Sequence, residues 1–154
     1  MAEALALVEL DSIARGLRCL DALVKRAPVQ MLEANLVEPG RYLILFCGGV
    51  AEVEESLHAA NEVGLEAIVD QLLLPQAHPG LLDGLRGMED VRDADEMDTI
   101  GVIEGARVAS TLCACDASLK DASVRLAGVR VSGGLGGKAY YLVFGPQHDV
   151  EIAI

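Results

Sequence analysis

The stretch Ala6-Leu7-Val8-Glu9, followed by Asp21-Ala22-Leu23-Val24-Lys25, decides the fold because the chain repeats it. It returns as Gly101-Val102-Ile103-Glu104 and Asp116-Ala117-Ser118-Leu119-Lys120, each 95 positions further along. A repeat at one constant spacing is typical of a chain built from two like units. The sequence therefore predicts two domains of the same fold in tandem.

An apolar stripe with helical spacing supports this interpretation. It occupies positions i, i+4, i+7 and i+11 of both copies: Ile13, Leu17, Leu20 and Val24 in the first, and Val108, Leu112, Cys115 and Leu119 in the second. Residues at this spacing share one face of a helix. We expect both helices to bury this stripe.

Each unit is expected to follow the order strand, helix, strand, strand, helix, strand. In the first copy, Asp11-Ser12 supplies a helix N-cap and Pro28 prevents the helix from continuing, while the turn Glu38-Pro39-Gly40-Arg41 separates two strands. The expected strands cover residues 5–10, 29–37, 42–47 and 67–74, and the expected helices end near residues 26 and 64. This order is the split-βαβ arrangement of ferredoxin-like folds, a mixed α/β (α+β) architecture.

The domain limits follow from the repeat and from the distribution of charge. We expect the first domain at residues 1–84, a charged linker at residues 85–98 and the second domain at residues 99–154. After two residues are gained in one loop, Leu57 of the first copy corresponds to Ile154. The second copy is therefore expected to be truncated, without its second helix and last strand. Either the sequence is clipped or a partner completes the domain, and we favour clipping.

Composition excludes several classes of partner. A formal net charge of −12 repels phosphate backbones and anionic lipids, and aromatic residues for base stacking make up only 3% of the chain. We expect no nucleic-acid and no membrane partner. The N-terminus lacks the basic region of a secretory signal, and the four cysteines show no Cys-x-x-Cys spacing. These features indicate a cytoplasmic protein whose cysteines are small, reduced core residues.

The repeated unit opens Ala-Leu-x-Leu-Val-Glu, carries Asp-Ala-x-x-Lys late in its first helix, and closes near Leu74-Pro75-Gln76-Ala77-His78-Pro79. In this order and spacing it resembles the bacterial microcompartment shell domain, over all of the first copy and about half of the second. Among such proteins the chain is most similar to the tandem-domain, trimer-forming type of propanediol utilisation. Gly134-Leu135-Gly136-Gly137-Lys138 also has a close parallel there.

The resemblance implies a structural and transport role and no enzymatic activity. Three chains would close into a homotrimer with six similar units, a pseudohexameric tile. Such tiles pack with other shell proteins of the same microcompartment into a facet in the cytoplasm. Small metabolites in transit would pass through a pore on the axis of the tile.

In the family, the loop between the second and third strands lines this pore. The residues at that place are Val37, Glu38, Pro39 and Gly40 in the first copy, and Ser132, Gly133, Gly134, Leu135 and Gly136 in the second. Three Glu38 side chains would form an acidic ring that favours cations or retains water. Alternatively, Glu38 is an exposed loop residue that points away from the opening.

Some trimeric relatives carry a Cys immediately before this Pro-Gly and hold an iron–sulfur cluster with it. Here Glu38 replaces the Cys, and a carboxylate is a poor ligand for so soft a cluster, so we expect no cluster, no metal and no other cofactor. The glycines of the second loop permit positive φ and could present backbone N–H groups to a polar metabolite or a small anion. Lys138 precedes a predicted strand and not a helix, which disfavours a nucleotide-binding glycine loop.

The resemblance also implies contacts between tiles. Lys25 and Lys120 match the edge lysine of the family, Arg26 lies beside the first of them, and His78 is family-like in position. Each has a simpler explanation: a lysine near a helix C-terminus interacts favourably with the helix dipole, and the other two can be ordinary surface residues.

Nothing in the sequence indicates catalysis, because the three histidines are dispersed and no Cys-His or Ser-His-Asp set is suggested. A rival hypothesis is a small-ligand-binding regulatory module, since paired ferredoxin-like domains often form effector clefts. Assembly into trimers and sheets distinguishes a shell tile from such a module. An electron-transfer protein is a third possibility, and Glu38 in place of the Cys argues against it.

Overall fold

The computed structural model describes residues 3–88 and 99–154. The chain divides between Ala77 and His78 into two compact units, seven residues before the domain limit expected at residue 84. The expected linker at residues 85–98 falls largely on residues 89–98, which lie outside the described residues. No helix in the described ranges is long and apolar enough to cross a membrane.

The first unit contains the six elements that the sequence predicts, in the predicted order. They are β1 (Ala4–Leu10), α1 (Ile13–Arg26), β2 (Gln30–Val37), β3 (Arg41–Gly48), α2 (Val50–Gly64) and β4 (Ile68–Leu74), with a short 3₁₀ turn, Leu65–Ala67, before the last strand. Ser12 caps α1 as expected, because its hydroxyl accepts a hydrogen bond from the N–H of Arg15 at 3.3 Å. The split-βαβ arrangement is confirmed.

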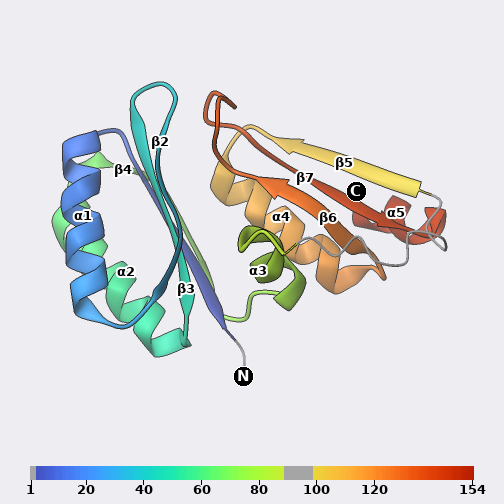
Figure 1. Cartoon of the computed structure of the whole chain (residues 1–154), viewed down its shortest axis with the longest axis horizontal. Helices are drawn as coiled ribbons and strands as arrows, with labels where there is room; N and C mark the ends of the chain where they lie inside the picture. The colour runs from blue at the N-terminus through green and yellow to red at the C-terminus, as the bar shows by residue number, and fades with distance from the viewer. Residues whose placement is uncertain (1–2, 89–98) are drawn as a thin grey trace. The chain divides into compact units, whose positions relative to one another are not determined.

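An antiparallel sheet of order β2-β3-β1-β4 forms one layer of this unit, and α1 and α2 form the other (Figure 1). The core between the layers contains Val8, Ile44 and Phe46 from the sheet and Cys19 and Leu23 from α1. Gly16 lets α1 approach the sheet closely, because a Cβ at this position would lie 2.6 Å from the Cβ of Tyr42. The small residue thus sets the distance between helix and sheet.

Of the four residues in the apolar stripe predicted for α1, only Leu20 packs against the core, and it is partly buried. In α1, Ile13, Leu17 and Val24 are 39%, 51% and 45% exposed, which contradicts the expectation that both copies bury the stripe. The helix instead turns Gly16, Cys19 and Leu23 inward, where the Cys19 thiol donates to the carbonyl of Ala60 and the Leu23 carbonyl accepts from Ser56. The stripe of the second copy, in contrast, is buried as expected.

The second unit repeats this plan with an additional helix at its beginning. Its elements are α3 (Pro79–Leu85), β5 (Thr99–Gly105), α4 (Val108–Asp121), β6 (Arg125–Arg130), β7 (Ala139–Gly145) and α5 (Gln147–Ala153). In the described residues the sheet is antiparallel with the order β5-β7-β6, and α4 and α5 pack against it (Figure 1). The sequence analysis did not predict α3, which buries Leu81 and Leu82.

The expectation that the second copy lacks its second helix is wrong, because α5 provides the start of that helix. Ser118 of α4 ties the two helices together, since its hydroxyl donates to the Ala153 carbonyl at 2.6 Å. The same hydroxyl shares a hydrogen bond of 2.9 Å with the phenol of Tyr141 in β7. Val150 and Ala153 are buried, so even two turns of helix cover part of the sheet.

Candidate functional site

The turn between β2 and β3 is the first of the two expected pore loops. Val37 pairs with Arg41 at the end of the ladder, and Val37 is buried while Glu38, Pro39 and Gly40 are exposed. Gly40 has φ +78°, the left-handed conformation that glycine adopts without strain. No atom lies within 4 Å of the position where its Cβ would be, so the tip of the turn is open.

The loop between β6 and β7 is the second, and it differs in its chemistry. Gly133, Gly134, Gly136 and Gly137 all have φ between +63° and +90°, and the Lys138 N–H closes the loop by donating to the Leu135 carbonyl at 3.1 Å. Ser132 and Leu135 are half-buried, while Gly133, Gly134 and Gly136 are exposed. Successive glycines in this conformation can present backbone N–H groups to an anion or a polar ligand.

A half-buried ion pair lies beside the first loop. The Arg41 guanidinium donates to Glu9 at 3.1 Å, and the Glu9 side chain is only 2% exposed although it stands in the apolar strand β1. Arg41 follows Gly40 directly, so this pair fixes the point where the turn joins β3. The sequence analysis missed this role, although a single carboxylate inside an apolar strand is a signal that could have indicated it.

A shallow hollow of about 260 Å³ adjoins the same turn. It is lined by Leu36, Val37, Glu38 and Gly40 from the turn and by Ile13 from the first turn of α1. An apolar floor with one carboxylate at its rim suits a small cation or a small polar molecule with an apolar part.

The expected edge residues lie in ion pairs at the ends of α1 and α4. Lys25 bonds to Asp21 at 2.7 Å, and the corresponding Lys120 bonds to Asp116 at 2.5 Å. Arg26 contacts carboxylates of α2, with Glu62 at 2.8 Å and Glu55 at 3.5 Å. Each of these cations is at least 40% exposed, so each can also reach a neighbouring molecule.

The half-buried His78 has a structural role that the sequence did not indicate. Its Nδ1 accepts a hydrogen bond from the Gly80 N–H at 3.1 Å, which makes His78 the N-cap of α3. Its own backbone N–H donates to the Asp116 carboxylate at 2.7 Å. Asp116 belongs to α4, so this hydrogen bond connects α3 to α4. The Asp116 side chain is only 7% exposed and also pairs with Lys120.

The cysteines are distributed differently from the expectation. Cys19, Cys47 and Cys115 are buried, and burial raises the pKa of the Cys115 thiol to about 12. Such a thiol stays protonated and unreactive. Cys113 is exposed on α4, so it is not a core residue as predicted. Among the described residues, no three His, Cys, Asp or Glu side chains are grouped to hold a metal ion.

Comparison with known proteins agrees with the repeat. A family model of the BMC domain matches residues 4–77 and again residues 99–154. The chain is 33% identical, over 154 residues, to the bacterial microcompartment shell protein PduT of Citrobacter freundii, with 100% of this chain and 82% of that protein covered.

Two solved structures are also similar. A microcompartment protein from Desulfitobacterium hafniense DCB has 35% identity and a TM-score of 0.91, over 99% of this chain and 83% of that one. The fused permuted hexameric shell protein MSM0275 from the RMM microcompartment shares the fold, with a TM-score of 0.65 at 16% identity over 98% of this chain and 79% of that one. Because the domain matches twice and the similarity to a shell protein extends along the whole sequence, this chain belongs to the bacterial microcompartment shell proteins and carries two BMC domains in tandem.

Proposed function

We propose that this shell protein forms a homotrimeric, pseudohexameric tile of a microcompartment facet in the cytoplasm, with an axial pore through which small metabolites pass. The observation that carries the proposal is the pair of BMC domains, each with an exposed loop at the same place between its second and third strands. Three such chains supply six similar units, which can close around one axis. The role is structural and requires no catalytic group.

The two loops give the proposed pore two kinds of lining. Three Glu38 carboxylates alternate with three glycine-rich loops, Gly133 to Gly137, so negative charge alternates with exposed backbone N–H groups. A ring of carboxylates favours cations over anions, and the peptide groups can bind the oxygens of polar metabolites. This combination suits neutral or cationic polar molecules better than phosphorylated ones.

The lining is proposed to work without a cofactor. No residue of the turn from Val37 to Arg41 carries sulfur, and Cys47 at the other end of β3 is fully buried. An iron–sulfur cluster requires thiolates directed at one point. The residues present therefore do not fit such a cluster at the turn between β2 and β3.

The exposed cations complete the tile at its edge. We place Lys25, Arg26 and Lys120 in contact with neighbouring shell proteins, together with His78 at the start of α3. The ion pairs of Lys25, Arg26 and Lys120 leave each of these cations partly exposed, so each can also meet a carboxylate of a neighbouring molecule.

The test is size-exclusion chromatography with light scattering on the natural gene product, followed by electron microscopy of any large fraction. The mass of three chains and the presence of sheets or tubes support the tile. A monomer or dimer that never assembles would refute it and would favour the regulatory module, which ligand screening would then examine.

A helpful second measurement uses Glu38→Gln in the assembled tile. This change removes the charge of the proposed ring while it preserves size, so passage of a cationic solute should slow relative to a neutral one. Glu66→Gln, at an exposed carboxylate in the 3₁₀ turn, is the matched control. Equal passage in all three proteins would remove Glu38 from the pore.

A further inference from the structure

Arg18 of α1 is the one cation of the first unit that has no acidic partner. Residues 3–77, all of which the structure describes, contain five Lys and Arg side chains and twelve Asp and Glu side chains. Four of the five cations pair with a carboxylate: Arg15 with Glu66 at 3.6 Å, Lys25 with Asp21 at 2.7 Å, Arg26 with Glu62 at 2.8 Å and Arg41 with Glu9 at 3.1 Å. The Arg18 side chain is exposed and forms no hydrogen bond or ion pair with any described residue. Its donors are therefore available to a ligand.

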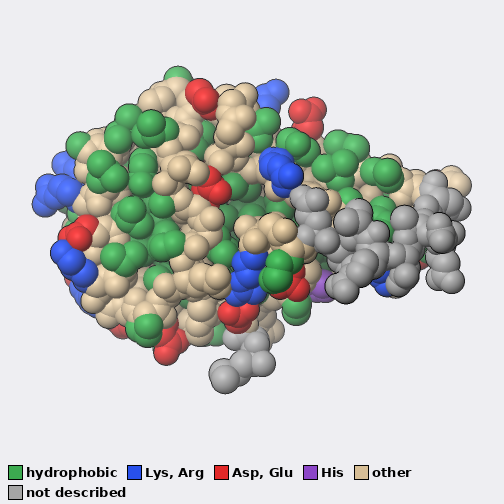
Figure 2. Space-filling model, viewed as in Figure 1, with side chains coloured by type: hydrophobic (Ala, Val, Ile, Leu, Met, Phe, Trp, Pro, Cys, Tyr) green, Lys and Arg blue, Asp and Glu red, His purple; other side chains and the backbone are tan. Residues whose placement is uncertain are grey.

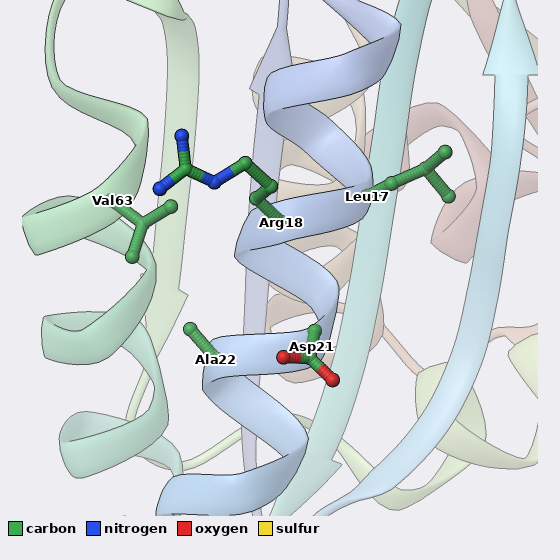
Figure 3. Close-up of a pocket in the computed structure, with 5 residues that line it drawn as sticks. All are labelled: Leu17, Arg18, Asp21, Ala22 and Val63. Carbon is green, nitrogen blue, oxygen red and sulfur yellow. The ribbon is translucent and has the colours of Figure 1, made fainter.

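The nearest acid along the helix is already paired. Asp21 follows Arg18 by three residues, a spacing at which side chains on a helix can interact. The Asp21 carboxylate instead pairs with Lys25, one turn further along α1, at 2.7 Å. Figure 3 shows that Asp21 and Arg18 point to different sides of α1. The helix thus leaves Arg18 without a counter-charge of its own.

A hollow between α1 and α2 lies beside this guanidinium. It measures about 420 Å³ and is lined by Leu17, Arg18, Asp21, Ala22 and Val63. Figure 3 shows Arg18 and Val63 directed toward each other across the space between the two helices, with Ala22 on the same side of α1. One charged donor therefore stands beside two apolar side chains. The volume is within the range of about 300–1,000 Å³ that is typical of small-molecule sites.

The surroundings of the hollow are positive although the chain is acidic. Four of the five cations of the first unit belong to α1, and Figure 2 shows Lys and Arg side chains gathered over this helix. Arg15, one turn before Arg18, donates to the Val63 carbonyl at 3.3 Å, so a second guanidinium lies at the same side of the hollow. Opposite charges attract more strongly at a protein surface than in bulk water. A negative group is therefore favoured beside Arg18.

Shape and charge together select the class of anion. A guanidinium and a carboxylate can form two parallel N–H···O bonds, because both groups are planar and their spacings match. Val63 and Ala22 can cover a short hydrocarbon chain attached to the carboxylate. Asp21 at the border of the hollow repels additional negative charge, which disfavours a doubly charged phosphate. These features fit a singly charged carboxylate on a short apolar chain.

We propose that the hollow between α1 and α2 binds a small monocarboxylate through Arg18. The site uses no residue of either pore loop and lies within the first unit, so it requires neither the trimer nor the tile. The second unit does not repeat it, because Cys113 stands in α4 at the place of Arg18. Each chain therefore has one such site.

A titration with butanoate tests the site on the natural gene product. With labelled valine methyl groups, the NMR signals of Val63 should shift saturably, with a dissociation constant on the order of 1 mM. Butan-1-ol lacks the charge and sodium chloride lacks the apolar chain, so neither should give this shift at matched concentration. Sodium phosphate should bind at least about fivefold more weakly than butanoate, because of Asp21.

Three variants assign the binding to Arg18. Arg18→Gln removes the charged fork and should weaken butanoate binding about tenfold. Arg18→Lys keeps the charge without the fork and should retain part of the affinity. Arg125→Gln is the matched control, because it removes one exposed arginine from β6 of the second unit, and it should leave the affinity unchanged. Circular dichroism will confirm that all three variants are folded.

Several results would overturn the site. These are the lack of a saturable shift with butanoate, and equal dissociation constants for Arg18→Gln and the original protein. Phosphate that binds as tightly as butanoate would overturn the assigned class of ligand. Light scattering on Arg18→Gln should give the mass of the original protein, so failure of this site leaves the tile standing. Loss of assembly in this variant would assign Arg18 to a contact between chains and overturn its role in ligand binding.

Discussion

Asp116 offers the sharpest test of how the second unit is held together. Its carboxylate accepts a hydrogen bond of 2.7 Å from the His78 N–H and an ion pair of 2.5 Å from Lys120, with the side chain 7% exposed. The change Asp116→Ala removes both contacts and leaves a backbone donor at the start of α3 without its acceptor. We expect α3 to open from α4 much more often.

The size of the effect follows from the type of bond. A hydrogen bond to a charged group contributes about 1.5–3 kcal/mol, and about 1.4 kcal/mol corresponds to a tenfold change in an equilibrium. Local opening of α3 should therefore increase on the order of 10- to 100-fold. Asp116→Asn keeps an oxygen acceptor without the charge and should lose about half of the free energy, because neutral hydrogen bonds are roughly half as strong.

Amide hydrogen exchange measured by mass spectrometry on peptides that cover α3 will check this. The matched control is Asp21→Ala, at the equivalent place in the repeat, where the exposed pair with Lys25 contributes only about 0.3–0.5 kcal/mol. An exposed pair of about 0.3–0.5 kcal/mol changes an equilibrium by roughly a factor of two. Exchange in α3 that increases by less than about threefold in Asp116→Ala would therefore refute the role assigned to Asp116.

Three further predictions concern single sites. Arg41→Ala leaves the buried Glu9 carboxylate without its cation and should lower the free energy of unfolding by about 2 kcal/mol. The loss is smaller than for a fully buried pair because Arg41 is 42% exposed. Adding Glu9→Leu to this variant should restore stability, and a denaturant titration of Arg41→Ala that shows no loss contradicts the prediction. Gly16→Ala improves helix propensity by about 1 kcal/mol, but the new Cβ would lie 2.6 Å from the Cβ of Tyr42. We expect this overlap to outweigh the gain and to lower the free energy of unfolding by about 1 kcal/mol. A raised melting temperature would contradict the prediction. Burial raises the pKa of the Cys115 thiol from 9.0 to about 12, so the unfolded chain loses this proton at lower pH than the folded chain. The free energy of unfolding should therefore fall by up to about 1.4 kcal/mol per pH unit between pH 9.0 and about 12. Cys115→Ala should show a shallower fall over this range, and an identical slope in the two proteins would contradict the prediction.

The order of the elements could be predicted from the sequence because it depends on local signals. Ser12 at a helix start, Pro28 after a helix end and the turn at Pro39-Gly40 each act within a few residues, and the structure has helix and strand ends where these residues predict them. The repeat then supplied the second domain, because two like sequences adopt like folds.

The direction in which an apolar stripe faces could not be predicted. Periodicity identifies which residues share a side of a helix, but it does not distinguish the protein core from another surface. In α1 the inward positions are Gly16, Cys19 and Leu23, two of them small, because the helix lies close to Tyr42 and to α2. The larger apolar residues therefore remain on the outer side.

The helix α3 and the buried acids were missed for related reasons. Pro79, Gly80 and Gly84 obscure the helical pattern, although proline is well suited to the first turn and Gly84 allows the close contact with Leu126. Glu9 and Asp116 look like surface carboxylates in the sequence, because their partners, Arg41 and His78, are brought near only by the fold.

The tandem arrangement has a consequence for the proposed pore. In a ring of six identical units every loop would carry the same residue, so a glutamate would appear six times around one narrow opening. Like charges at short range repel, and the repulsion grows as the dielectric constant of the surroundings falls. In the proposed trimer the glycine-rich loop separates each Glu38 from the next, which halves the charge and places peptide N–H groups between the carboxylates. Two different loops on one chain can thus combine an acidic ring with a polar, flexible lining that a single repeated domain could not provide.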